Sequence, residues 1–488
     1  MPNAGLNRQA SSHKIALEEG LALTSIATSA STLDSYSPVG TEEELAGPPH
    51  AVAPVKRAER ISSIDTLRGF ALLGILILNI DDFGGPLFLH DIPPNPAFTG
   101  PHAHLNLIVL FIKWMFFEGK MRFLFSMLFG AGVVLLTERA ERRGAAGKVA
   151  DIYLRRNMWL VVLGLLHGTF IWDGDILLQY GSAALLFLYP CRKLKPKTLF
   201  TAGSLLLLVL WTYGVLQFTG LAQALRLSSK AATVIAAQNA GHPLTPEQKK
   251  VEQQWNEMVK KHEVTKQKID EEIADAHVGY LNHLLDEGFN YEKSFASRSP
   301  FFTVPESVGA MLIGMGLYKT GFLLAELSYG TYLWTALLGF LVSIPVYVIG
   351  IWKAYESGFF FLTIYKWVYL PYPLTELAGG LAVTATLLIV IKTRTFHRLL
   401  RPIAAVGQTA LTNYLLTSVL CQFVFLWGPW KLFGKLDYYQ VNYVLLSVWV
   451  INLTLSTLWL RAFEFGPVEW LWRSATYWKL QPMLKKAT

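Results

Sequence analysis

Apolar residues recur along the chain in blocks of about 20 residues, the length of helix that crosses a bilayer. Polar and charged segments separate ten such blocks from one another. The blocks lie at 64–80, 121–137, 157–172, 174–190, 198–217, 301–317, 328–351, 374–391, 403–427 and 441–460. This pattern predicts an all-α, polytopic transmembrane helical bundle with about ten spans.

A shorter apolar run, 105–118, carries Lys113 and Glu118. If this run crossed the membrane, the six basic residues within 139–156 would lie outside, against the tendency of Lys and Arg to stay in the cytoplasm. We therefore expect an interfacial or re-entrant helix. The first outer loop, 81–104, contains no Lys or Arg, and both termini are predicted to be cytoplasmic.

Two polar segments divide the chain into four regions. Residues 1–57 lack a sustained apolar run and are predicted to be a disordered cytoplasmic tail. The insertion 218–300 carries both charge signs at helical spacing, which predicts an outer-side helical segment acting as a lid or spacer. The regions 58–217 and 301–488 are the two transmembrane halves, the second ending in a cytoplasmic tail.

Composition narrows the possible functions. Apolar residues make up 52% of the chain and charged residues 16%, whereas soluble domains carry roughly 25% charged residues. The formal net charge of +8 is explained by orientation in a membrane with anionic lipids, and we expect no nucleic-acid partner. Cys191 and Cys421 form neither a metal-ligand motif nor a disulfide framework, so no metal site is predicted.

Ionisable residues within or at the ends of spans are the main candidates for chemistry, because burying them in a membrane is costly. His167 stands near the end of the third span between Gly164 and Gly168, which thin the helix and admit a close neighbour. Asp173 and Asp175 follow directly, and a carboxylate can orient an imidazole that acts as a general base. The alternative is a buried histidine that only hydrogen-bonds another helix.

A second cluster, Glu118, Lys120 and Arg122, precedes the second span at the predicted outer boundary. Positive charge is unexpected there, and one interpretation is a rim that binds anions. The alternative is a local ion pair whose long side chains snorkel to the interface.

A third cluster begins with Asp81 at the end of the first span and continues with His102 and His104 in the outer loop. Each histidine is a candidate general base. Solvated loop histidines are the alternative, and a His-x-His pair without a third ligand is a weak metal site. Glu306 and Glu376 are further polar residues within or at the ends of later spans.

Five motifs, in this order, resemble the YeiB-like bacterial membrane proteins. Together they extend over roughly residues 58–480. They are DTLRGFALLGI at 65–75, FFEGKMRFLFSMLFGAG at 116–132, GLLHGTFIWDGDIL at 164–177, GQTALTNYL at 407–415 and FGPVEWLWRSATYW at 465–478.

The opening D-x-x-R-G block and the helix count also resemble the wider transmembrane acyltransferase group, which includes heparan-alpha-glucosaminide acetyltransferase. This resemblance implies acyl-CoA as a cytoplasmic donor and a glycan or lipid-linked acceptor on the outer side, modified with the help of a histidine. His167 with Asp175, or else His102 or His104, would then be catalytic.

The remaining candidates take roles in binding. Lys120 and Arg122 would bind an anionic acceptor or stabilise oxyanion charge. Glu118, Asp173 and Asp81 would also take part in substrate binding. Arg68, Arg155 and Arg156 would meet the phosphates of the donor, although anchoring at lipid headgroups explains them equally well.

The sequence thus predicts a multi-pass acyltransferase of the bacterial cytoplasmic membrane, moving an acyl group, expected to be acetyl, to a hydroxyl or amine on the outer side. A proton-coupled transporter or flippase is the alternative, with Asp81, Glu118, His167 and Asp175 as a proton or substrate path. A third reading is a structural or signalling protein in which these residues only hold helices together.

Overall fold

The computed structural model describes residues 62–86, 100–142, 146–217, 219–280, 291, 293, 295–296, 303–393 and 395–485. The chain divides into Met1–Pro49 and a compact unit, His50–Thr488. The predicted tail, 1–57, lies outside the described residues, as does most of 281–302.

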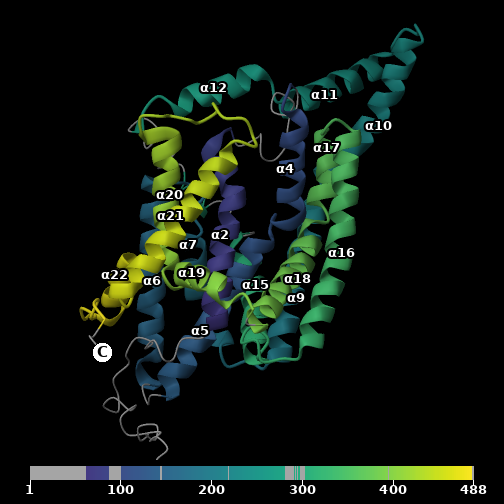
Figure 1. Cartoon of the computed structure of the whole chain (residues 1–488). Helices are drawn as coiled ribbons and strands as arrows, with labels where there is room; N and C mark the ends of the chain where they lie inside the picture. Colours follow the sequence, from purple (N-terminus) through teal and green to yellow (C-terminus); the bar gives the residue numbers. More distant parts are fainter. Residues whose placement is uncertain are drawn as a thin grey trace, which may run out of the picture. The chain divides into compact units, whose positions relative to one another are not determined.

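Helices account for nearly all regular structure in these ranges, and the one extended pairing that the structure describes is an isolated bridge between Phe463 and Leu484. This confirms the all-α prediction (Figure 1). The helices are α2 (Ser62–Gly84), α4 (Ala103–Phe116), α5 (Lys120–Arg142), α6 (Val149–Phe170), α7 (Leu177–Ala183), α8 (Tyr189–Cys191), α9 (Pro196–Gln217), α10 (Thr219–Asn239), α11 (Pro246–His262), α12 (Lys266–Ala276), α15 (Thr303–Lys319), α16 (Tyr329–Glu356), α17 (Phe361–Ile364), α18 (Tyr372–Lys392), α19 (His397–Gln408), α20 (Ala410–Gln422), α21 (Val441–Ala462) and α22 (Pro467–Tyr477).

Within the described ranges, seven helical stretches are long and apolar enough to cross a membrane. They are Ser62–Gly84, Ala103–Arg142, Pro196–Gly214, Tyr329–Glu356, Tyr372–Lys392, Ala410–Trp427 and Val441–Ala462. The other predicted spans correspond to α6, α15 and the short helical stretch Leu177–Cys191, which are shorter or less apolar. The polytopic architecture is therefore confirmed, and the count of ten spans stays a prediction.

Large apolar side chains on the outside of the bundle agree with a lipid environment. On α16, Leu333, Trp334 and Leu341 are each more than half exposed, and α9 exposes Leu205 and Leu208 in the same way. Water would disfavour so much apolar surface on one face, whereas lipid tails accept it.

The run predicted to be interfacial or re-entrant forms α4, which packs one face against the bundle and leaves Leu105, Ile108, Ile112 and Phe116 exposed. Leu110 and Trp114 are buried against a cluster that includes Ile351 of α16. The chain breaks between α4 and α5 at Gly119, where φ is +69° and an added Cβ would come 2.5 Å from the Tyr372 hydroxyl. Because α4 and α5 together form one apolar stretch, counting them as a single broken crossing leaves the predicted orientation of later helices unchanged.

Small residues allow the central helices to approach closely. An added Cβ at Gly130 of α5 would come 2.0 Å from the carbonyl oxygen of Met311, and one at Gly314 of α15 would come 2.0 Å from that of Met127. Such contacts are typical of helix packing in membranes, where backbones rather than long side chains meet. Since α15 comes from the second half of the chain and α5 from the first, the two predicted halves share one core.

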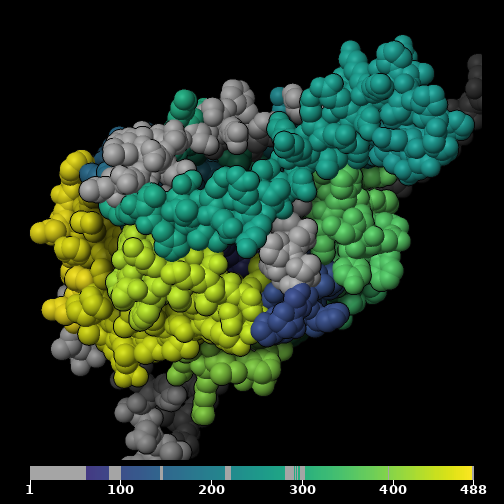
Figure 2. Space-filling view, turned by 90° about the horizontal axis from the view of Figure 1, so that it is seen from above, coloured from purple at the N-terminus to yellow at the C-terminus, as the bar shows by residue number. Residues whose placement is uncertain are grey.

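The part of the insertion that the structure describes up to residue 280 consists mainly of the helices α10, α11 and α12, in agreement with the charge pattern. Thr245 and Gln248 form a reciprocal cap at the start of α11, which packs on α10. Helix α12 packs elsewhere: its Ile273 side chain lies against Gly434, in the loop 428–440. Figure 2 shows α11 and α12, in teal, extending across the face above the yellow-green helices of the second half.

Candidate functional site

A cavity of about 600 Å³ opens beside the break between α4 and α5. We call it the acidic cavity because four carboxylates line it: Asp82, Glu118, Asp173 and Asp175. Among the described residues that line it, Arg122 is the one cation, and aromatic side chains such as Trp172 and Tyr372 complete the wall. Polar groups converging in a concave site are typical of ligand binding.

A second cavity, of about 260 Å³, lies between α2, α5, α6 and the helices of the C-terminal region. We call it the arginine cavity because four arginines line it: Arg68, Arg139, Arg156 and Arg473. Most of its other lining residues are apolar, among them Phe125, Phe129 and Leu160.

The two cavities approach each other at the start of α7. Ile176 lines both, while Asp175 borders the acidic cavity and Tyr414 borders the arginine cavity. The Tyr414 hydroxyl donates to Asp175 Oδ2 at 3.4 Å and accepts from the Ile176 backbone N–H at 3.2 Å. A thin layer of side chains therefore separates the cavities.

His167 and Asp175 form a buried pair within that layer. His167 Nδ1 lies 2.8 Å from Asp175 Oδ2, and the two side chains are 1% and 0% exposed. The second carboxylate oxygen accepts from the Leu178 N–H at 2.8 Å and from the Tyr291 hydroxyl at 3.4 Å. With the carboxylate accepting from Nδ1–H, the imidazole presents the lone pair of Nε2, which is buried and has no hydrogen-bond partner in the part of the chain that the structure describes.

The glycines beside His167 allow a close approach of neighbouring groups, as their spacing predicts. An added Cβ at Gly164 would come 2.1 Å from the Leu178 backbone nitrogen, and one at Gly168 would come 2.1 Å from the ring of Tyr291. The thinned helix thus lets the Asp175 turn approach the imidazole and lets Tyr291 pack against α6 and reach Asp175. The imidazole centroid lies 5.0 Å from that of Tyr414 and 6.4 Å from that of Trp172.

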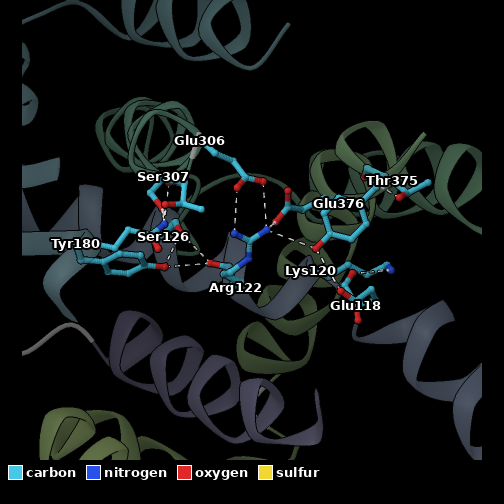
Figure 3. A network of polar contacts seen from close by, with 12 residues as sticks. Glu118, Lys120, Arg122, Ser126, Tyr180, Glu306, Ser307, Thr375 and Glu376 are labelled. Atoms are coloured by element: carbon cyan, nitrogen blue, oxygen red, sulfur yellow. Dashed lines mark hydrogen bonds and ion pairs between the residues drawn. The ribbon is translucent and has the colours of Figure 1, made fainter. Parts of the chain in front are cut away.

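Arg122 is the centre of the network in Figure 3. Its guanidinium donates twice to Glu306, at 3.1 Å each, and once to Glu376 at 3.0 Å. The Tyr372 hydroxyl joins Arg122 at 3.4 Å and donates to Glu118 at 3.3 Å. Two carboxylates neutralise this arginine, so it supports the wall of the acidic cavity and has little charge left for an anion.

Lys120 points away from the acidic cavity. Its side chain is almost fully buried, and its ammonium group donates to the carbonyl oxygens of Trp114 and Glu118 at 3.4 and 3.3 Å. The same group lies 4.1 Å from the ring centre of Tyr347. These contacts hold the α4–α5 break together, and they leave Lys120 outside the lining of either cavity.

Asp81 forms a buried ion pair between two helices. Its carboxylate accepts from Lys113 at 2.5 Å and from the Tyr438 hydroxyl at 2.8 Å, with both members of the ion pair about 3% exposed. The pair joins α2 to α4, and Asp81 does not line the acidic cavity.

The structure does not bring the loop histidines to His167. His102 is half exposed and lies 2.8 Å from Asp437, and His104 is exposed. Neither lines either cavity.

The three candidate donor-binding arginines separate into two groups. Arg68 and Arg156 line the arginine cavity, whereas Arg155 does not and pairs with Asp151 at 2.5 Å. Arg68 donates to Asp65 at 3.2 Å and to the Gly407 carbonyl at 3.4 Å.

Sequence reasoning did not single out Tyr414, Tyr291 or Arg473 as site residues. Tyr414 and Arg473 stand within two of the quoted motifs, GQTALTNYL and FGPVEWLWRSATYW, which was the available signal. No local signal marks Tyr291, because only tertiary structure brings it to Asp175.

Glu469, also missed, positions the start of α20. Its carboxylate accepts from the N–H groups of Leu411 and Thr412 at 2.6 and 3.0 Å, where the helix dipole favours an acceptor. Burial raises the pKa of the Glu469 carboxyl, against the opposing effect of these hydrogen bonds. In the ranges that the structure covers, no three His, Cys, Asp or Glu side chains gather as metal ligands.

Comparison with known proteins places the chain among uncharacterised relatives. A family described as "Protein of unknown function (DUF418)" matches residues 317–479. "Uncharacterized protein YeiB" of Escherichia coli (strain K12) is 30% identical over 445 residues, covering 88% of this chain and 100% of YeiB. "Uncharacterized protein YxaH" of Bacillus subtilis (strain 168) is 29% identical over 447 residues, covering 89% of this chain and 99% of YxaH. No solved structure matches. The chain therefore belongs to the YeiB-like family of multi-pass membrane proteins.

Proposed function

We propose that the protein is a transmembrane acyltransferase in which His167 acts between two cavities. A thioester donor, acyl-CoA, enters the arginine cavity, and a hydroxyl or amine of a glycan or lipid-linked acceptor enters the acidic cavity. The acyl group, expected to be acetyl, passes between them at the layer formed by His167, Asp175 and Tyr414. No metal ion takes part in the proposed reaction.

One observation carries this proposal. A buried imidazole is oriented by a carboxylate at 2.8 Å, and its other nitrogen has no partner among the described residues. Leaving a buried polar atom unsatisfied costs about 1–3 kcal/mol, and we propose that a bound substrate satisfies this nitrogen. An imidazole whose only role was to join helices would be expected to use both nitrogens.

The proposed step is a proton-coupled acyl transfer. Nε2 of His167 takes the proton of the acceptor hydroxyl or amine as that group attacks the thioester carbonyl carbon. The carbon–sulfur bond then breaks, and the imidazolium returns the proton to the leaving thiolate. Asp175 positions the ring and stabilises its positive charge without itself being protonated.

Orientation in the membrane follows from the same proposal. We infer that the arginine cavity faces the cytoplasm of a bacterial cell and the acidic cavity faces the outer side of its cytoplasmic membrane, with both termini inside. The basic residues within 139–156 and the absence of Lys and Arg from 81–104 support this orientation.

The alternative, a proton-coupled transporter or flippase, requires the ionisable residues to form a path. Asp81 is bound to Lys113, Glu118 belongs to the Arg122 network, and His167 pairs with Asp175. These three groups have separate partners, which favours a localised reaction over a continuous relay.

The test is acyl transfer in membranes that contain the protein, with radiolabelled acetyl-CoA as donor. We expect label in a lipid or glycan product, and its rate should fall about 10²- to 10⁴-fold in His167→Gln and Asp175→Asn. His104→Gln, a change at an exposed histidine, is the matched control and should keep full activity. Thermal stability of each purified variant separates lost chemistry from lost folding.

Two results would overturn the proposal. Full transfer activity in His167→Gln would remove the imidazole from the reaction. Absence of any labelled product, combined with His167-dependent movement of a substrate across the membrane, would favour the transporter.

A further inference from the structure

The arginine cavity carries more positive than negative charge. Four arginines line it, whereas the acidic side chains in its lining are Asp65 and Glu469. Asp65 pairs with Arg68, and Glu469 is held by the N-terminal N–H groups of α20. Concentrating like charges in a mostly apolar cavity is unfavourable unless an anion joins them.

Arg156 has the position and surroundings that best suit binding of such an anion. Its guanidinium carbon lies 3.7 Å from the ring centre of Trp472, and the Trp472 indole N–H donates to the Arg156 carbonyl at 2.8 Å. Within the described chain no carboxylate pairs with Arg156, and the nearby charges of Arg473 and Arg68 repel it. A guanidinium stacked on an aromatic face keeps its N–H edge available for two parallel hydrogen bonds to an oxyanion.

Beyond the arginines the cavity becomes apolar. Its wall there comes from α5, α6 and α7 and includes Phe125, Phe129, Val133 and Leu160. This part reaches Ile176, next to the His167–Asp175 pair. A ligand that fills the whole cavity therefore has an anionic head and an apolar or weakly polar chain.

We propose that the arginine cavity binds a phosphate-bearing amphiphile, with the phosphate on Arg156 and Arg473 and the chain directed toward Ile176. Phosphate suits the site because it carries up to two charges and offers the oxygen geometry that the arginine fork matches. Two sources supply this chemistry: a soluble coenzyme thioester and a membrane phospholipid. The inference rests on the proposed function only in naming the first source.

Direct binding to the purified full-length protein in a neutral detergent tests the site without any reaction. Coenzyme A represents the soluble source, dodecyl phosphate the lipid source, and inorganic pyrophosphate the phosphate without a chain. Affinity is measured by equilibrium dialysis with radiolabelled probes. We expect one or both amphiphiles to bind more tightly than pyrophosphate, with affinity that falls as salt rises.

Arginine variants locate the binding. Arg156→Gln and Arg473→Gln should each weaken binding about tenfold or more, since each removes a charge-assisted contact to phosphate. Arg155→Gln is the matched control: it changes the neighbouring arginine on the same helix, which pairs with Asp151 and lies outside the cavity. Its affinity should stay within about twofold of the unchanged protein. Arg156→Lys keeps the positive charge and serves as a second variant if Arg156→Gln does not fold. It should bind the probes less tightly than the unchanged protein, because lysine lacks the planar guanidinium that stacks on Trp472 and donates two parallel hydrogen bonds.

Each outcome decides the question. Tighter binding of coenzyme A identifies a coenzyme site, and tighter binding of dodecyl phosphate identifies a phospholipid site. Binding of neither probe, or equal affinity in Arg156→Gln, Arg473→Gln and Arg155→Gln, would overturn the inference. Because no acyl group is present, intact probe binding in a protein without acyl transfer would refute the proposed function and leave this inference standing.

Discussion

Replacing Arg122 by glutamine tests whether its network with two glutamates stabilises the fold. The guanidinium bridges Glu306 on α15 and Glu376 on α18, so a single side chain of α5 joins three helices. Without it, the carboxylates of Glu306 and Glu376 lose the guanidinium that lies between them. One or both must then take up a proton or water.

The expected loss of unfolding free energy depends on how far the side chains of the network are exposed to solvent. Breaking a buried ion pair by removing one partner costs about 3–5 kcal/mol. The side chains of Arg122 and Glu306 are 35% and 29% exposed, but that of Glu376 is only 6% exposed. Solvent screening of the first pair lowers the expected loss for Arg122→Gln below this range, to about 2–3 kcal/mol of unfolding free energy.

The assay is reversible unfolding in mixed micelles by SDS titration, applied as a double-mutant cycle. Arg122→Gln combined with Glu376→Gln should recover about 1–2 kcal/mol, because the most buried uncompensated carboxylate is gone. Arg142→Gln is the surface control: its side chain is 80% exposed and 3.9 Å from Glu138, so less than about 0.5 kcal/mol is expected. If Arg122→Gln unfolded like Arg142→Gln, or the double variant were additive, the network would not be a stabilising unit.

Two further predictions concern the break in α4–α5 and the orientation of the chain. Gly119→Ala should lower the free energy of unfolding by about 1–3 kcal/mol in the same titration, because φ is positive at Gly119 and the new methyl group meets Tyr372. Gly132→Ala is the control: nothing lies within 4 Å of the new methyl group, so this variant should be neutral or slightly stabilising. Equal stability of the two variants would contradict the packing at Gly119. Cysteines introduced at Thr99 and Ala146 should react with a membrane-impermeant thiol reagent from outside and from inside respectively, and labelling of Ala146→Cys from outside intact cells would reverse the predicted orientation.

Sequence reasoning worked where partners are close along the chain. His167 and Asp175 are eight residues apart, and the glycines beside His167 predict a thinned helix, so the pair could be proposed from one motif. The Arg122 network could not, because its glutamates stand 184 and 254 residues away. Helical periodicity predicts which faces are apolar, but it does not say which two spans become neighbours.

Position within a motif does not determine where each charged side chain lies. Lys120 and Arg122 are two residues apart, yet one is buried against backbone carbonyls and the other reaches two glutamates from distant helices. On α6, Arg155 and Arg156 are adjacent and therefore point about 100° apart. Only Arg156 lines the arginine cavity. A run of charges predicts a polar region, while the helical rotation of each residue decides which member reaches the site.

The five motifs that carry the family resemblance converge on the two cavities. The first supplies Arg68, the fourth Tyr414 and the fifth Arg473 to the arginine cavity, while the second supplies Arg122 to the acidic cavity. The third, residues 164–177, provides the His167–Asp175 pair in the layer between them. In this chain, segments that lie far apart in the sequence therefore meet around one buried imidazole, because each motif places at least one side chain in a cavity wall or in the layer between the cavities.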